Sequence, residues 1–191
     1  MNTRLAILSD IQCILDLQEI NLFENLAQSE KDNGFVTTRF TTPQLEEVLN
    51  SRGLFVAEND GKVLGYTMAA GWDYFSQWAI FPYMISRLSG FIFKGTKISN
   101  QNSFQYGPIC VDSSLRGTDT FPRLFDEMRI ELSASYPVGI TFINKVNERS
   151  LNAHTRKLGM VVVDEFEFSG REYYGLAFDT NLSVFPPNNL K

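Results

Sequence analysis

The chain has 191 residues, with 43% hydrophobic and 20% charged side chains and a formal net charge of −5. These values exclude a disordered chain and favour one domain with a substantial core. No apolar run reaches the ~18 residues of a membrane helix, so no membrane partner is expected, and the acidic charge argues against a nucleic-acid partner. Cys13 and Cys110 lie far apart without metal-ligand spacing, so we expect reduced core thiols in a cytoplasmic protein without a metal site.

The first 70 residues predict a strand, two helices and a hairpin. The first helix is expected to start at Ser9 or Asp10, which are both capping residue types. The second is expected at Thr42 and Pro43, because a capping hydroxyl is followed by proline in the first turn. An Asn-Asp-Gly turn then favours a tight reversal between two strands. The expected strands cover residues 3–7, 54–58 and 63–70.

The second half of the chain predicts alternating strands and helices. A strand at 106–111 precedes a helix with an apolar stripe at helical spacing, and a strand at 138–143 follows. Residues 160–168 and 171–178 are expected to close the fold as a hairpin. The order indicates one mixed α/β domain over residues 1–184 with a frayed tail at 185–191. The stripe consists of Phe121, Leu124, Phe125, Met128 and Leu132.

A polar face is expected on the helix that follows residue 143. If the segment is helical, one face carries an amide, a hydroxyl and the only histidine of the chain, with two leucines between them. Gly159 stands where a helix end favours a residue that tolerates positive φ. The residues of this face are Asn147, Ser150, Leu151, His154 and Leu158.

A candidate anion site lies between the strand at 106–111 and the helix after it. A strand that feeds a short loop into a helix N-terminus presents unpaired backbone N–H groups and the positive end of the helix dipole. The loop covers residues 112–121. The alternative is an ordinary helix cap formed by Asp119 or Thr120.

Taken in order, three segments resemble the cofactor-binding elements of the GNAT superfamily of acyl-CoA N-acyltransferases. The strand at 106–111 is similar to the central strand of that family, residues 116–117 open its phosphate loop, and residues 147–154 follow on its second cofactor helix. The resemblance implies an α/β fold with a central, mostly antiparallel twisted sheet flanked by helices. It also implies transfer of an acetyl group from acetyl-CoA to a primary amine of a small molecule or a protein.

The resemblance further implies which residues hold acetyl-CoA. Asp119 and Phe121 depart from the family pattern, because small residues are expected at both positions. An inward-pointing Asp119 would repel a diphosphate by on the order of 1–3 kcal/mol. Asn147 bonds the pantetheine amides in this interpretation, and its alternative role is a helix N-cap. The implied cofactor-binding residues are Ile109, Cys110, Val111, Arg116, Gly117, Thr118, Asp119, Thr120, Phe121, Asn147 and Ser150.

His154 is the candidate proton donor to the leaving sulfur. It occupies the position where the family usually has a tyrosine, and an imidazole that titrates near neutrality can donate at physiological pH. The alternative is a helix-face histidine bonded to solvent or backbone. Tyr106 is the second catalytic candidate, and it is a potential general base together with Glu24 and Asp73, although no spacing supports any of the three.

A long segment at 71–105 separates two strands that the family often joins by a short hairpin. Connections of this length usually contain structure or function. One hypothesis is that its aromatic residues wall an acceptor pocket for an apolar or aromatic amine. The alternative is that they cover the sheet edge as extra core or form the surface of a homodimer. The aromatic residues include Trp72, Tyr74, Phe75, Trp78, Phe81, Tyr83, Phe91 and Phe93.

Two alternatives to an acetyltransferase stay open. The first is a GNAT fold that binds an acyl-CoA or another ligand without catalysis, which Asp119 and Phe121 favour. The second is a structural or dimerisation protein built on the aromatic segment. Fold analogy alone does not decide between them.

Overall fold

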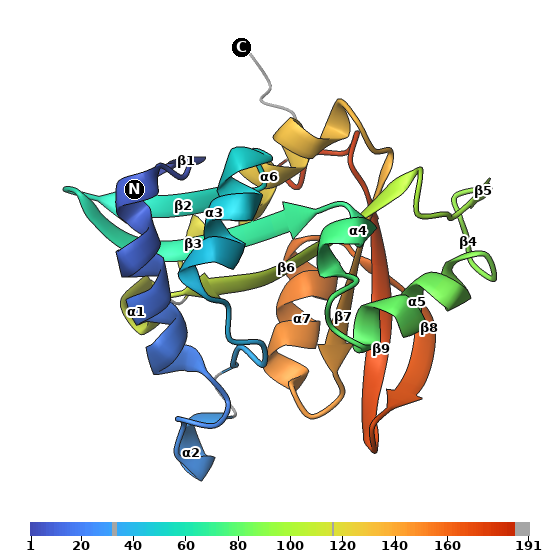
Figure 1. The fold of residues 1–191 in the computed structure, drawn as a ribbon, viewed down its shortest axis with the longest axis horizontal. Coiled ribbons are helices and arrows are strands. Elements are labelled where there is room, and N and C mark those ends of the chain that lie inside the picture. Colours follow the sequence, from blue (N-terminus) through green and yellow to red (C-terminus); the bar gives the residue numbers. More distant parts are fainter. Residues whose placement is uncertain (32–33, 116, 186–191) are drawn as a thin grey trace.

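A seven-stranded twisted sheet forms the centre of the protein in a computed structural model that describes residues 1–31, 34–115 and 117–185 (Figure 1). Its strand order is β1-β2-β3-β6-β7-β9-β8, and only the β6–β7 pair is parallel. A separate two-stranded ribbon pairs β4 with β5. The strands are β1 Asn2–Leu5, β2 Leu54–Asn59, β3 Lys62–Ala70, β4 Ile92–Phe93, β5 Thr96–Lys97, β6 Ser103–Val111, β7 Val138–Asn144, β8 Val161–Phe168 and β9 Arg171–Asp179.

Helices contribute to both faces of the sheet. Alternate residues of β2 point to opposite faces, and they enter two different core clusters. One cluster contains the apolar sides of α1, α3 and α5, and the other contains those of α6 and α7. The helices are α1 Ile11–Asn21, α2 Gln28–Lys31, α3 Thr42–Asn50, α4 Trp72–Phe75, α5 Ile80–Leu88, α6 Thr120–Ser133 and α7 Glu148–Lys157, with 3-10 turns at Leu8–Asp10 and Ser113–Leu115.

The central strands β6 and β7 pair over a short stretch and then separate. Ser103 to Gln105 pair with Val138 to Ile140, and the two strands diverge beyond these residues. On its other side β6 stays paired with β3, with an irregularity opposite Met68 where β6 carries an extra residue. Gly107 lies in this irregularity with φ of 109°, a value that favours glycine. The divergence opens a cleft in the middle of the sheet.

Packing of large rings fixes the position of Tyr106 beside this cleft. The ring of Phe178 packs edge-on against Tyr106 at 5.8 Å and against Phe125 at 4.8 Å between ring centroids. Phe178 in turn occupies the space above Gly139, where an added Cβ would lie 2.0 Å from its Cζ atom. Such a contact is impossible without displacement of the ring or the strand, so glycine at 139 is a packing requirement for the site.

The mixed α/β fold with a mostly antiparallel sheet is confirmed, and two local expectations are corrected. The cap of α3 is Thr41 rather than Thr42, since the Thr41 backbone N–H donates to Gln44 Oε1 at 2.9 Å. Cys13 was expected in the core but is exposed, because it lies on the outer side of α1, whereas Cys110 is buried.

The structure bears on two further expectations, one about the long segment at 71–105 and one about the C-terminal tail. The segment at 71–105 contains α4, α5 and the β4–β5 ribbon, and β6 begins at Ser103. Residues 186–191 of the expected tail lie outside the described residues, so the boundary at 184 stays a prediction. Within the described ranges, no helix combines the length and apolar character needed to cross a bilayer.

Candidate active site

The cleft has two halves that meet at α7. The aromatic half lies between the diverging strands and includes Phe75, Phe81, Gln105 and Tyr173. The loop half extends along β6 toward the start of α6 and includes Gly117, Thr118 and Phe121. Because six residues line both halves, the two form one continuous groove. The shared residues are Phe35, Val36, Ile109, Asn147, Ser150 and His154.

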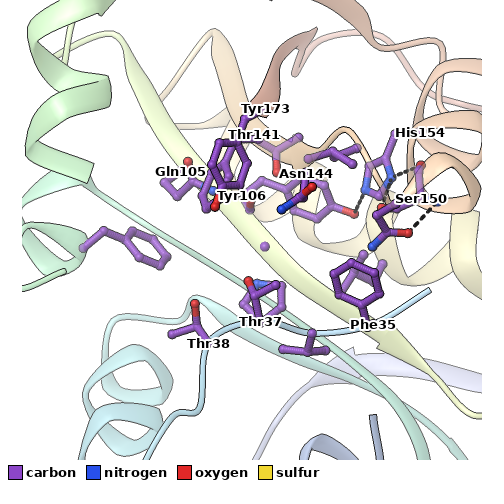
Figure 2. Close-up of a pocket in the computed structure, with 18 of the residues that line it drawn as sticks. Phe35, Thr37, Thr38, Gln105, Tyr106, Thr141, Asn144, Ser150, His154 and Tyr173 are labelled. Atoms are coloured by element: carbon purple, nitrogen blue, oxygen red, sulfur yellow. Dashed lines mark hydrogen bonds between the residues drawn. The ribbon is translucent and has the colours of Figure 1, made fainter. Parts of the chain in front are cut away.

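A buried tyrosine–histidine pair stands where the halves meet. Tyr106 Oη lies 3.2 Å from His154 Nε2, and Figure 2 shows the two side chains pointing toward each other. His154 Nδ1 lies 2.7 Å from the backbone oxygen of Ser150. Since that carbonyl can only accept, Nδ1 carries the proton of the neutral imidazole and Nε2 accepts from the Tyr106 hydroxyl. The geometry therefore fixes both the tautomer and the direction of the hydrogen bond.

Burial keeps this pair uncharged. The His154 side chain is 4% exposed and Tyr106 is fully buried. Desolvation lowers the pKa of His154 to about 4, and the Ser150 carbonyl offsets only part of that effect. Burial also raises the pKa of Tyr106 well above its ordinary value. From the sequence, the pKa of His154 was expected near neutrality. In the structure burial lowers this pKa, so the imidazole is neutral at physiological pH.

Asn147 begins the helix that carries His154. Its side-chain oxygen accepts a hydrogen bond from the Ser150 backbone N–H at 3.2 Å, so it is the N-cap of α7. It is 7% exposed and lines both halves of the cleft. At the other end of α7, Gly159 has φ of 66°, the conformation that its position predicted. Capping thus sets the orientation of the histidine at the junction.

The loop half provides an environment for an anion. Gly117 has φ of 86°, and the chain then enters α6 at Thr120. Arg149 and Lys157 of α7 line the same half, and none of the described residues that line it is acidic. A helix N-terminus and two cations along one groove favour a phosphate-bearing ligand.

Asp119 and Phe121, which depart from the expected loop pattern, differ in whether they line the loop half of the cleft. Asp119 is exposed, and its carboxylate pairs with Arg123 Nε at 2.6 Å. Asp119 is absent from the described lining of the loop half, so its charge is directed elsewhere. Phe121 does line that half, and its ring packs edge-on against His154 at 5.3 Å between centroids. Phe121 therefore covers the imidazole on the loop side.

Most residues nominated from the sequence come together in the cleft. Thr120 is buried and, like Asp119, lies outside the described lining, while Arg116 falls outside the described residues. The alternative bases also lie elsewhere: Glu24 is exposed and bonded to Arg39, and Asp73 is exposed on α4. The nominated residues that line the cleft are Tyr106, Ile109, Cys110, Val111, Gly117, Thr118, Phe121, Asn147, Ser150 and His154.

The aromatic segment serves both as core and as cleft wall. Trp72 is buried and donates from Nε1 to Ser103 Oγ at 3.0 Å, and Tyr74 donates to the Gln44 carbonyl at 3.0 Å. Neither lines the aromatic half, whereas Phe75 and Phe81 do. Phe75 and Phe81 also pack on each other with centroids 4.7 Å apart. The segment thus supplies one wall of the cleft through two of its rings.

Several residues that line the cleft were not predicted from the sequence. Residues 34–36 cross the cleft beside α1, held by the Val36 N–H to Asn21 carbonyl bond at 2.9 Å, and they carry no periodic pattern. Arg149 lies four residues before Ala153 and eight before Lys157, so helix geometry places the three along one stripe that lines the groove. The sequence did not indicate that Gln105 lines the cleft, because residues of a strand that separates from its neighbour have the same pattern as ordinary core residues.

Solved structures share this architecture along almost the whole chain. A Salmonella typhimurium protein assigned as an acetyltransferase, solved with its cofactor acetyl-CoA, has a TM-score of 0.62 at 14% identity, covering 94% of this chain and 93% of its own. The ribosomal-protein-alanine N-acetyltransferase of Brucella melitensis has a TM-score of 0.60 at 17% identity, covering 94% and 99%. The protein has the GNAT fold.

The GNAT fold is also seen in an N-acetyltransferase from Staphylococcus aureus Mu50, with a TM-score of 0.60, 18% identity and coverage of 94% and 98%. At such identities the likeness establishes the fold. No protein-family model matches the sequence, and no curated protein matches it. The GNAT architecture predicted from three sequence segments is therefore confirmed by structure rather than by sequence similarity.

Proposed function

We propose that this protein transfers an acetyl group from acetyl-CoA to a primary amine. The observation that carries the proposal is the Tyr106–His154 pair, buried where an aromatic pocket meets a basic groove. Bringing two reactants together at a positioned proton donor is what acyl transfer requires. The acetyl-CoA-bound neighbour with the same fold adds support for the donor.

The loop half fits acetyl-CoA in its chemistry. Its Gly117 turn and the α6 N-terminus offer backbone N–H groups, and Arg149 and Lys157 offer charge, all suited to the phosphates of the cofactor. Asn147 and the β6 backbone line the route from there to the junction, suited to the pantetheine amides. Acetyl-CoA would supply the acyl group in activated form, as a thioester.

Tyr106 is the proposed catalytic residue. Acyl transfer moves one proton from the amine nitrogen to the sulfur, and the Tyr106 Oη atom lies at the junction of the halves. In our proposal the phenol turns its O–H from His154 Nε2 to the sulfur, gives its proton there and regains one from the nitrogen, so that proton and charge balance. The raised pKa of Tyr106 keeps the phenol protonated beforehand.

His154 is the proposed positioning residue. Its Nε2 atom accepts from the Tyr106 hydroxyl, and the Ser150 carbonyl holds its Nδ1–H. This arrangement revises the direct donation to sulfur expected for His154, since its one ring proton is bonded to Ser150. Hydrogen bonds to Tyr106 and Ser150, together with the Phe121 ring, thus hold the imidazole, which in turn orients the phenol.

The backbone of β6 is the proposed site of carbonyl polarisation. β6 pairs with β7 only as far as Gln105, so its later residues face the cleft instead of a strand. Ile109 lines both halves, and Cys110 and Val111 line the loop half. Backbone N–H groups here would stabilise the negative charge that forms on the carbonyl oxygen.

Release of free CoA with a panel of primary amines tests the proposal. Tyr106→Phe should lower kcat by roughly 10²–10⁴-fold, the range of a lost acid–base group. Tyr66→Phe is the matched control, because Tyr66 is equally buried but lies outside the described cleft lining, and its hydroxyl has no partner among the described residues. A Tyr106→Phe enzyme as active as wild type would remove the phenol from the mechanism.

A non-catalytic acyl-CoA-binding protein is the second candidate. Phe121 favours it, because a ring on the loop side of His154 narrows the groove where the family has a small residue. This candidate predicts that the folded protein binds acetyl-CoA but releases no CoA with any amine. Phe121→Gly would then restore slow turnover by reopening the groove.

A further inference from the structure

The aromatic half of the cleft carries no formal charge on any of the described residues that line it. Its walls combine rings with amide and hydroxyl groups, and the one titratable imidazole among them is neutral. Moving an ammonium ion from water into such surroundings costs several kcal/mol unless a carboxylate or several acceptors replace its hydration. The wall composition therefore favours an uncharged ligand. The rings that contribute to it, besides Tyr106, are Phe35, Phe40, Phe75, Phe81, Phe142 and Tyr173.

Gln105 provides a hydrogen-bond acceptor in this half that lacks a partner. Its side chain is 2% exposed, and its Nε2 atom donates to the Tyr106 carbonyl at 2.7 Å. That bond fixes which end of the amide is nitrogen, since the carbonyl of Tyr106 can only accept. Gln105 Oε1 is then buried without a hydrogen bond within the described part of the chain.

An unpaired buried amide oxygen is costly and calls for a donor. Leaving such a group unsatisfied costs about 1–3 kcal/mol, and native proteins tolerate few of them. Figure 2 shows Gln105 on the side of the pocket away from Ser150. Gln105 directly precedes Tyr106 in β6, and successive strand residues point to opposite faces, so the two groups approach a ligand from different sides.

We propose that the acceptor is an aromatic primary amine that is uncharged at neutral pH, of the arylamine class. Its N–H group donates to Gln105 Oε1, and its ring lies against the Phe81 and Phe142 side of the pocket. This inference rests on the proposed function and names the substrate class of the same site. An uncharged N–H donor satisfies the amide oxygen without bringing a charge into the pocket.

The chemistry of the cleft agrees with this class. An alkylammonium must lose a proton before it can attack, and no described carboxylate lines the aromatic half to accept it. An arylamine arrives with its lone pair available. Only the proton released after attack then needs a path, and the Tyr106 phenol provides one. The described lining of the aromatic half thus offers no carboxylate base, and an arylamine is a nucleophile that does not require one.

Two isomeric amines test the inference by binding alone. 4-Ethylaniline is uncharged at neutral pH, whereas its isomer 4-methylbenzylamine is protonated, and both have the same size and apolar surface. Calorimetric titration of the protein saturated with CoA should give at least roughly tenfold tighter binding of 4-ethylaniline. Equal affinity, tighter binding of the benzylammonium ion through the aromatic rings, or no binding of either would overturn the inference.

Variants at Gln105 separate its role from that of the walls. Gln105→Leu should weaken 4-ethylaniline binding about five- to tenfold, and Gln105→Glu should shift the preference toward 4-methylbenzylamine. Gln12→Leu, an exposed glutamine on α1, is the control and should leave both affinities unchanged. An unaltered preference in both Gln105 variants, with wild-type acetyl-CoA affinity as proof of folding, would remove Gln105 from recognition.

Turnover measured on the same isomers distinguishes the inference from the function on which it rests. Selective binding of 4-ethylaniline without release of CoA would support the ligand class while contradicting the transferase. Faster acetylation of 4-methylbenzylamine would support the transferase and overturn the arylamine class. Acetylation of 4-ethylaniline with little activity on its isomer would support both.

Discussion

Tyr106 Oη and His154 Nε2 lie 3.2 Å apart, although the two residues are 48 positions apart in the chain. Tyr106 is the first residue of β6 beyond its pairing with β7, and His154 belongs to α7. Their hydrogen bond thus joins the strand that forms one side of the cleft to the helix that forms the other. Because both groups are buried and uncharged, the pair is a fixed proton donor and acceptor rather than a titrating switch.

Substitutions of His154 should show that it acts through Tyr106. His154→Leu removes the acceptor at Nε2 and should lower kcat by roughly 10–100-fold, with a smaller change in the KM for acetyl-CoA. His154→Gln places an amide near the same position and should restore part of the rate. Steady-state kinetics of both variants check this expectation, and equal losses in the two would argue for packing alone.

Folding stability should depend on pH through His154. Its folded pKa of about 4 lies below the ordinary value of 6.5, because burial disfavours the imidazolium. The stability contributed by the neutral ring is therefore complete above pH 6.5 and is lost as pH falls through about 4. The full loss amounts to about 3 kcal/mol. Urea unfolding at pH 7 and pH 4 should show a smaller pH effect in His154→Gln than in wild type, and identical pH effects would contradict a buried neutral histidine.

The backbone conformation at Gly117 should affect the affinity for acetyl-CoA more than the charge of Asp119 does. Gly117→Ala forces a side chain into φ of 86° at a strain of about 1–2 kcal/mol and should weaken acetyl-CoA binding several-fold. Asp119→Asn removes an exposed charge that is paired with Arg123 and should leave the affinity within about twofold. Gly61→Ala, at a turn with φ of 77°, is the control for strain remote from the cleft. A larger effect of Asp119→Asn than of Gly117→Ala on calorimetric affinity would show that the carboxylate does face the phosphates.

Two cations of α7 should contribute to acetyl-CoA affinity. Arg149 and Lys157 line the loop half, so Arg149→Gln and Lys157→Gln should each weaken binding and reduce its salt dependence. Arg156 is on the same helix but outside the described lining of both halves, so Arg156→Gln is the matched control. Calorimetry at low and high salt measures the effect, and equal losses in all three variants would indicate only a general surface field.

Local patterns allowed most elements of the fold to be predicted. The hairpin of β8 and β9 was placed at Ser169 and Gly170, which have φ of 51° and 71° as a tight turn requires. The helix from Asn147 was placed by its cap and by Gly159 at its end. These features depend on neighbours in sequence, so the sequence contains them.

The chemistry of the site depends on tertiary contacts and was predicted less completely. The pKa of His154 follows from burial against Tyr106 and Phe121, which come from β6 and α6. The irregularity at Gly107 changes which β6 residues face each side, and period-two alternation does not predict it. The cleft wall at 34–36 lacks any regular pattern, since its position depends on hydrogen bonds to α1.

Calorimetric titration of the wild-type protein with acetyl-CoA tests the central claim most directly. A GNAT fold whose loop half holds the phosphates and whose Tyr106–His154 pair meets the thioester predicts one binding site per chain, with a Kd on the order of micromolar. A several-fold weakening of that binding in Gly117→Ala and its retention in Tyr106→Phe would place the ligand in this cleft. Failure of the folded wild-type protein to bind acetyl-CoA at millimolar concentration would contradict the account.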